Sequence, residues 1–338
     1  MVSDRPDMLD GAIAPEANTV LFGHDEAERF LADSYRNGRL HHAILIEGPE
    51  GIGKATLAFR FANHVISHPK PTEAPEVIGD PDPGSAVARQ IASGASHNIL
   101  HIRRPFDEKT GKMKSVITVD EVRRVGHFFS QTAGSDNWRI AVIDAADHMN
   151  RNAANALLKT LEEPPKNSLF LVLSHAPGRL LPTIRSRCLG LALDPLDRGA
   201  MGAALDHLGV RFDLDSGYEA TEGSVARALV MANYGGVEIA GTFDSLMDRS
   251  AVSDRSEIHK LAQALSAKDR DIAYHFFVDH VISRVRRHSG HLAAQGRGRE
   301  AAREAERASA VAAHFERAET YNLDRGQAVI NLFSILFD

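Results

Sequence analysis

The chain has 338 residues, of which 43% are hydrophobic and 25% are charged, and these are the proportions of an ordinary globular protein with two or three domains. Its formal net charge of −6 argues against a free-standing nucleic-acid binder that relies on a bulk positive field, so a DNA contact would have to be local or shared with partners. The single cysteine, Cys188, excludes a disulfide framework and a cysteine-based zinc site. The acidic N-terminal segment resembles no signal peptide and no apolar run is long enough to cross a membrane, so we expect a cytoplasmic protein without membrane contact.

The chain reads as a flexible arm followed by three domains. Residues 1–18 are rich in Asp, Pro and small residues and predict the arm. Residues 19–195 alternate apolar strands with amphipathic helices, which predicts an α/β domain with a parallel sheet covered on both faces. Residues 196–248 predict a small helical lid domain, and residues 249–338 predict a larger all-helical domain. Within the α/β domain, the proline-dense residues 69–84 predict a loop that does not pack.

Five apolar runs predict the strands of the sheet, and those at residues 140–143, 169–174 and 188–193 read as buried. The five runs are residues 43–46, 98–103, 140–143, 169–174 and 188–193. In the lid domain, residues 214–223 predict a polar break between helices.

The most informative stretch is residues 41–57, HHAILIEGPEGIGKATL, which has the order strand, glycine-rich turn, helix. Gly48, Gly51 and Gly53 would let backbone N–H groups converge on an anion at a helix N-terminus. Lys54 would reach the outer phosphates of a nucleotide, and the spacing fits a P-loop. The alternative is a chance glycine turn, which the flanking strand and helix patterns disfavour.

The residues that should complete a magnesium-dependent site are altered. The residue after the lysine should carry a hydroxyl for Mg²⁺ but is Ala55, and Thr56 comes one position late, about 100° round the helix. Asp144 ends a strand, where it would order the metal or would simply meet solvent or cap a helix. A glutamate base is expected next, but the residue is Ala145, and Asp147 is no evident replacement. We therefore expect a site that cradles phosphate without turning it over.

A second candidate site is the segment Ser186-Arg187-Cys188, which follows an apolar segment just before the last strand. A guanidinium exposed there suits the stabilisation of phosphoryl-transfer charge in a neighbouring subunit. The alternative is a structural ion pair of Arg187, and the spacing alone favours that alternative. Cys188 reads as a small buried strand residue rather than a reactive thiol.

Two further patterns predict no site. His64 and His68 lie one helical turn apart, but no third ligand follows at a zinc-motif spacing, so no metal is expected. Residues 296–317 carry interleaved arginines and acids, and this predicts a solvated helix rather than a helix that follows DNA.

Four motifs in this order, GPEGIGKATL, AVIDAADHMN, NAANALLKTLEEPP and LPTIRSRC, resemble the clamp-loader AAA+ proteins of bacterial DNA polymerase III. The resemblance covers about residues 20–195. It implies that Arg187, within Ser186-Arg187-Cys188, is an arginine finger presented to ATP on an adjacent subunit, and that Ser174 occupies the sensor-1 position. It also implies that the C-terminal helices form an oligomeric collar. The zinc module of many family members would fall in the cysteine-free residues 69–84, so no zinc is expected.

Two kinds of family member compete, the ATP-hydrolysing gamma/tau motors and the delta-prime subunits. Ala55 and Ala145 depart from the motor pattern, and Arg227 lies one residue late for the arginine that senses nucleotide after a Gly-Ser pair. The chain is therefore more similar to delta-prime subunits, with a degenerate site of Gly48, Gly51, Gly53, Lys54, Thr56 and Asp144 that would hold ATP or ADP without hydrolysis. That resemblance implies no enzyme activity in isolation. The implied partners are the gamma/tau and delta subunits, the sliding clamp and primed DNA. The resemblance also implies that the chain is part of the DNA polymerase III holoenzyme, in a bacterial replisome associated with the nucleoid.

Overall fold

The structure is a computed structural model that describes residues 8–109, 112–130, 137–248, 255–267 and 270–337. The chain forms two compact units, residues 1–226 and residues 227–338, each of which is described by itself. The division of the chain into an arm and three domains stays a prediction.

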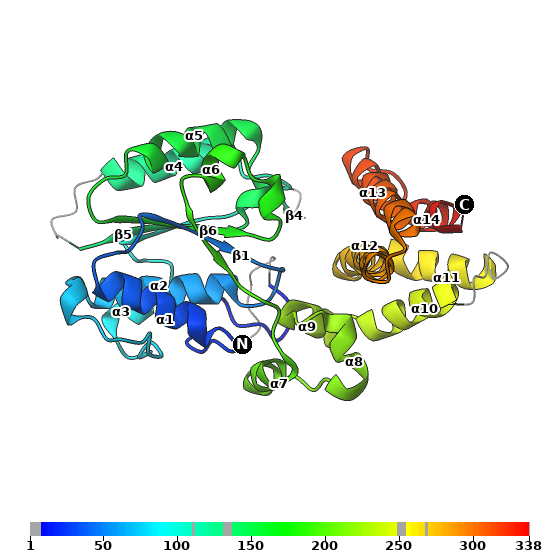
Figure 1. The fold of residues 1–338 in the computed structure, drawn as a ribbon, viewed down its shortest axis with the longest axis horizontal. Coiled ribbons are helices and arrows are strands. Elements are labelled where there is room, and N and C mark those ends of the chain that lie inside the picture. Colours follow the sequence, from blue (N-terminus) through cyan, green and yellow to red (C-terminus); the bar gives the residue numbers. More distant parts are fainter. Residues whose placement is uncertain (1–7, 110–111, 131–136, 249–254, 268–269, 338) are drawn as a thin grey trace. The chain divides into compact units, whose positions relative to one another are not determined.

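The first unit is built on one parallel sheet of five strands, as expected (Figure 1). The strands are β1 (Ala43–Glu47), β2 (Ile99–Ile102), β5 (Arg139–Ile143), β6 (Ser168–Ser174) and β7 (Leu189–Ala192). Their spatial order is β2-β5-β6-β1-β7, so the strand that precedes the P-loop lies between the two last strands of the chain. A separate antiparallel pair is formed by β3 (Phe106–Asp107) and β4 (Lys112–Met113). The predicted α/β fold class with a five-stranded parallel sheet is confirmed.

Helices cover both faces of this sheet, because β-strand side chains alternate between the faces. In β1, Ile44 and Ile46 join one buried cluster, whereas Ala43 and Leu45 join the other. Figure 1 shows the helices on the two sides of the sheet. One side carries α1 (Asp25–Arg36), α2 (Lys54–Ser67) and α3 (Ala86–Ala92), and the other carries α4 (Val119–Ser130), α5 (Arg151–Glu162) and α6 (Pro182–Arg185).

The last strand of the sheet differs from its prediction. β7 pairs only with β1, so it lies at an edge, and most of its residues are exposed or half-buried rather than buried. Leu189 is among the exposed large apolar side chains. The apolar run correctly predicts the strand, but its burial depends on the position of the strand in the sheet, and the run does not encode that position.

The proline-dense residues 69–84 pack, contrary to expectation. Ala74 and Ile78 are buried in the same cluster as α1 and α2. This segment contains a short 3-10 turn, Pro71–Glu73, and the carbonyl of Ala74 accepts a hydrogen bond from Arg36.

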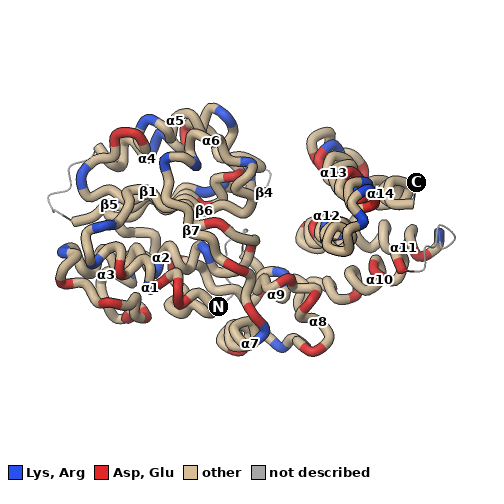
Figure 2. Tube along the Cα trace, in the orientation of Figure 1, with Lys and Arg blue, Asp and Glu red and all other residues tan. Residues whose placement is uncertain are grey.

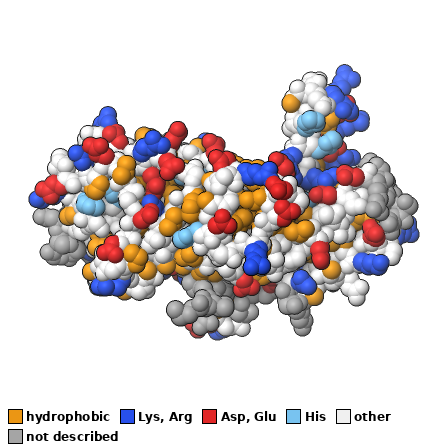
Figure 3. All heavy atoms as spheres, turned by 90° about the horizontal axis from the view of Figure 1, so that it is seen from below, with side chains coloured by type: hydrophobic (Ala, Val, Ile, Leu, Met, Phe, Trp, Pro, Cys, Tyr) orange, Lys and Arg blue, Asp and Glu red, His pale blue; other side chains and the backbone are white. Residues whose placement is uncertain are grey.

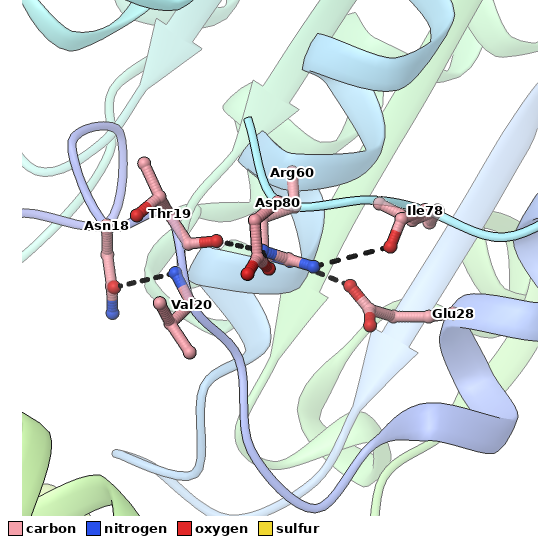
Figure 4. A network of polar contacts seen from close by, with 7 residues as sticks. All are labelled: Asn18, Thr19, Val20, Glu28, Arg60, Ile78 and Asp80. Atoms are coloured by element: carbon pink, nitrogen blue, oxygen red, sulfur yellow. Dashed lines mark hydrogen bonds and ion pairs between the residues drawn. The ribbon is translucent and has the colours of Figure 1, made fainter. Parts of the chain in front are cut away.

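A buried arginine on α2 fastens this segment to the unit (Figure 4). The Arg60 side chain, only 3% exposed, contacts the carboxylates of Glu28 and Asp80 at 2.7 Å each. It also donates to the backbone carbonyls of Thr19 and Ile78. A single guanidinium therefore joins residue 19, helix α1 and the proline-dense segment, and all five of its donors can be used in such a fork.

The remaining elements are helical. The first unit ends with α7 (Arg198–His207), α8 (Leu214–Thr221) and the start of α9 (Val225–Asn233). The predicted polar break at residues 214–223 is wrong, because α8 forms there with Asp213 capping its N-terminus. The second unit continues with α10 (Gly236–Asp248), α11 (Arg255–Ser266), α12 (Asp271–Ala294), α13 (Gly298–Thr320) and α14 (Arg325–Phe337), packed around Phe243, Phe277, Val311 and Leu332. Within the described residues, no helix combines the length and the apolarity that a membrane span requires.

Candidate functional site

The glycine-rich turn lies between β1 and α2, as the P-loop pattern predicts. Gly48, Gly51 and Gly53 have φ values of 149°, 76° and 106°, which favour residues without a Cβ. Gly53 forms the N-cap of α2, so the first N–H groups of a 14-residue helix face the turn. The backbone therefore has the geometry that receives an anion at a helix N-terminus.

Lys54 is folded back onto this turn. Its ammonium donates to the carbonyl of Gly48 at 2.6 Å and to the carbonyl of Pro49, and the residue is 3% exposed. Burial lowers the pKa of Lys54 to about 8, although the negative charges of Glu50, Asp144 and Asp147 act in the opposite direction. Two of its three donors are thus already used by the loop itself.

The metal side of the site does not fit Mg²⁺. Position 55 presents a methyl group, and Thr56 is buried in the first turn of α2. The Asp144 carboxylate lies 3.5 Å from Nε2 of His101, which β2 places beside it. Burial acts to raise the pKa of Asp144, but the neighbouring His101, His175 and Lys54 together leave it below its usual value. An imidazole thus lies against the carboxylate where the hard cation would need a free oxygen ligand.

Asp147 lies within the same site but its oxygens are occupied. They accept hydrogen bonds from Ser174 Oγ at 2.7 Å, from the His175 backbone N–H at 2.5 Å and from the Ala176 N–H at 3.3 Å. Ser174, the predicted sensor-1 residue at the end of β6, is fully buried, and its hydroxyl donates to Asp147. Burial, followed by the charge of Lys54, lowers the pKa of the neighbouring His175. Geometry therefore gives Asp147 the role of a structural acceptor rather than that of a base that orients water.

The end of the first unit packs against the P-loop, which the sequence did not reveal. Ser224 Oγ donates to the carbonyl of Glu50 at 2.8 Å, and the Val225 N–H donates to the carbonyl of Gly51 at 3.0 Å. A Cβ added to Gly51 would lie 2.3 Å from the Cβ of Ala226. In the sequence, the Gly223-Ser224 pair drew attention to Arg227, whereas in the structure Ser224 itself contacts the P-loop. In the second unit, Arg227 stacks over the ring of Phe276, with its Cζ 5.6 Å from the ring centroid.

Arg187 forms the ion pair that the spacing favoured. Its Nη2 lies 2.7 Å from Oε1 of Glu162 at the end of α5, and its Nη1 donates to the carbonyl of Thr183 at 2.9 Å. Ser186 Oγ lies 3.4 Å from the same Nη1. The arginine side chain is still 35% exposed, so part of the guanidinium reaches solvent.

Cys188 follows immediately, and its thiol is half-buried. Burial raises the pKa of Cys188 to about 11, which keeps the thiol protonated at neutral pH and makes it a poor nucleophile. In the part of the chain that the structure describes, no group of three or more His, Cys, Asp or Glu side chains could hold a metal ion.

A P-loop between β1 and α2 of a five-stranded parallel sheet, followed by helices, defines a P-loop protein of the AAA+ class. The chain belongs to the family described as DNA polymerase III, delta subunit, whose model matches residues 23–197.

Relatives with established names support this membership. The chain is 38% identical over 148 residues to a DNA polymerase III subunit delta′ of Pseudomonas aeruginosa, which covers 44% of this chain and 42% of the relative. It is 34% identical over 173 residues to the delta′ subunit of Bacillus subtilis, covering 51% and 48% of the two chains. A tau subunit of Escherichia coli is 28% identical over 253 residues, which is 75% of this chain and 36% of the relative. The expected kinship with delta-prime subunits is confirmed, and the matches to the delta′ relatives span less than half of their length.

Proposed function

We propose that this chain acts as a clamp-loader subunit of the delta-prime kind. In this proposal it assembles with gamma/tau and delta subunits through its C-terminal helices and helps to load the sliding clamp onto primed DNA. The observation that carries the proposal is that the side chains of the nucleotide site are engaged with one another or with the loop itself. Lys54 is bonded to the carbonyls of its own loop, Asp144 faces His101, and position 55 has no hydroxyl.

The contribution of the chain to catalysis is then Arg187. Its guanidinium is partly exposed, and this type of group suits the stabilisation of phosphoryl-transfer charge on ATP held by an adjacent motor subunit. The P-loop of this chain binds ATP or ADP without hydrolysis, through Gly48, Gly51, Gly53, Lys54 and the N–H groups of α2. Such a role places the chain in the bacterial cytoplasm, at the replisome.

The first experiment measures ATP turnover by the purified chain with Mg²⁺, beside a Lys54→Ala variant. We expect no turnover above that of the variant, because no residue completes the metal site. Equilibrium binding of a fluorescent ATP analogue to both proteins separates a static binder from a loop that takes no nucleotide.

The second experiment uses the assembled complex and the variant Arg187→Ala. Loss of an arginine finger should lower the DNA-stimulated ATPase by about 10³-fold or more. The matched control is Arg185→Ala, two residues away on α6 and exposed, which should leave the rate within about twofold of wild type. An unchanged rate in Arg187→Ala would reject the finger assignment.

A second candidate function is an ATP-hydrolysing motor of the gamma/tau kind. The match to the tau subunit over 75% of this chain favours it. Lys54-dependent turnover by the isolated chain would establish this candidate and overturn the degenerate site.

A further inference from the structure

The reversal between α12 and α13 concentrates positive charge in an otherwise acidic chain. Residues 284–303, here named the basic tip, contain six arginines, two histidines and one glutamate, against a net charge of −6 for the whole chain. Figure 2 marks the Lys and Arg positions along these two helices. In Figure 3, arginine or lysine and histidine side chains gather on the projection at the upper right, in the region of α12 and α13.

The tip is a defined structure. Gly296, with a φ of 76°, ends α12 and lets the chain reverse. Ser289 Oγ donates to the carbonyl of Ala301 at 2.7 Å and joins the two helices across the reversal. Leu292 and Ala301 are buried between the helices, so the polar residues on the opposite sides are displayed from a fixed backbone.

Part of the charge of the tip is available to a ligand. Arg286, Arg299 and Arg303 are exposed, on the last turns of α12 and the first turns of α13. Among the described residues, Arg286 and Arg299 have no ion-pair partner.

Arg284 and Arg297 are engaged within the chain. Arg284 contacts Asp244 and Asp248 at 2.7 and 2.6 Å, and Arg297 is paired with Glu300 at 2.5 Å. These two support the local structure, and Arg286, Arg299 and Arg303 carry the surplus charge.

Helix stabilisation explains only part of this arrangement. Cations in the last turns of α12 interact favourably with the negative end of the helix dipole. The same dipole disfavours cations in the first turns of α13, where Arg299 and Arg303 lie. A requirement for positive charge on both helices therefore points to an external anion.

We propose that the basic tip binds the phosphate backbone of DNA without sequence preference. All six cations are arginines, whose planar forks match phosphate oxygens in a bidentate manner. No exposed large apolar side chain is described between residues 284 and 303, so the tip lacks the apolar face with which a peripheral helix enters a lipid surface. Residues 284–303 also contain no Phe, Tyr or Trp for stacking on bases, so we expect the arginines to contact the phosphate backbone.

The choice of DNA as the polyanion rests on membership of a DNA polymerase III family and agrees with the proposed function. The proposal does not involve Arg187 or the nucleotide site, so each can fail without the other. The acidic net charge required a DNA contact to be local or shared with partners, and the basic tip is a local contact.

The test measures the anisotropy of a fluorescent DNA duplex with a single-stranded overhang, titrated with the full chain at about 50 to 200 mM salt. Three phosphate contacts, by Arg286, Arg299 and Arg303, predict a slope of log affinity against log salt of about −3. The variant Arg286→Gln/Arg299→Gln/Arg303→Gln should bind at least about 10-fold more weakly and bring the slope close to zero. Binding of this variant with wild-type affinity would overturn the proposal.

Two further variants separate binding by the tip from binding by bulk charge and from effects of unfolding. Arg29→Gln/Arg39→Gln/Arg123→Gln removes the same charge from exposed sites of the first unit and should bind like wild type. An equal loss in this control would assign the binding to bulk charge and reject the tip.

Glu300→Gln releases Arg297 and should raise the affinity about twofold to fivefold, a gain that partial unfolding could not produce. Binding to phosphatidylglycerol vesicles with no binding to DNA would also overturn the proposal, in favour of a lipid surface.

Discussion

Arg187 and Glu162 form an ion pair, with 2.7 Å between Nη2 and Oε1, and the two side chains are 35% and 50% exposed. The pair joins the segment before β7 to the end of α5. A pair this exposed adds at most about 1 kcal/mol to the free energy of unfolding. Its more useful effect is that it orients the guanidinium together with the carbonyl of Thr183.

A change at Glu162 should therefore affect rate more than stability. In the assembled complex, Glu162→Gln should lower the ATPase rate by about 2- to 10-fold with little change in KM, because a mobile guanidinium is less well positioned. Glu163→Gln, at the next residue, is the matched control and should behave like wild type. A faster rate in Glu162→Gln would show instead that the carboxylate competes with phosphate for Arg187.

Arg60→Met should strongly destabilise the first unit. It leaves Glu28, whose side chain is 12% exposed, without its partner, and burial already raises the pKa of Glu28. We expect a loss of about 3 to 5 kcal/mol in the free energy of unfolding, measured in urea. Arg39→Met breaks a pair with Asp33 that is exposed on both sides and should cost less than about 1 kcal/mol.

The double variant Glu28→Gln/Arg60→Met should recover part of the loss, because it removes the uncompensated charge. Equal losses in Arg60→Met and Arg39→Met would contradict the role of Arg60 as the anchor of residues 69–84.

His64 should make the protein sensitive to acid. Burial lowers the pKa of His64 from 6.5 to about 4 in a setting that includes the rings of Tyr35, Phe61 and His68. Between these two pH values the unfolded chain binds the proton and the folded chain does not. The free energy of unfolding should therefore fall as the pH drops from 6.5 to 4, by about 3 kcal/mol at most from this residue.

His64→Phe should remove this part of the pH dependence, as thermal unfolding between pH 7 and pH 4 would reveal. His97→Gln, at an exposed position, provides the comparison and should retain the wild-type dependence. Parallel stability curves for His64→Phe and wild type would refute the assignment.

Gly51→Ala should disturb the contact between the P-loop and residues 224–226. The new Cβ would lie 2.5 Å from Ser224 Oγ, at a backbone position with a φ of 76°. We expect a loss of roughly 2 to 4 kcal/mol in the free energy of unfolding and faster hydrogen exchange at the Val225 amide. Gly178→Ala, where nothing lies within 4 Å of the added Cβ and φ is not positive, should change stability by less than about 1 kcal/mol. Unchanged exchange at Val225 in Gly51→Ala would argue against the contact.

The sequence alone determined the order of the strands along the chain, the P-loop between β1 and α2, and the family. These features are local, because the alternation of apolar residues and the spacing of glycines are read within about 20 residues. The same local patterns identified Gly48, Gly51, Gly53, Lys54 and Asp144 as one candidate site, although their functional roles stay predictions.

Only the tertiary structure decided which groups face one another. His101 reaches Asp144 because β2 and β5 are neighbours in the sheet, and strand order is not written in either strand. Ala74 and Ile78 are buried in a segment that Arg60 contacts from a different element, and neither feature is visible in the local sequence. Residues 296–317 read as a solvated helix in the sequence, and only the reversal at Gly296 places the arginines of α13 beside those of α12. Local periodicity encodes elements, whereas pairings between distant side chains follow from how those elements pack, and the packing decides the chemistry of the site.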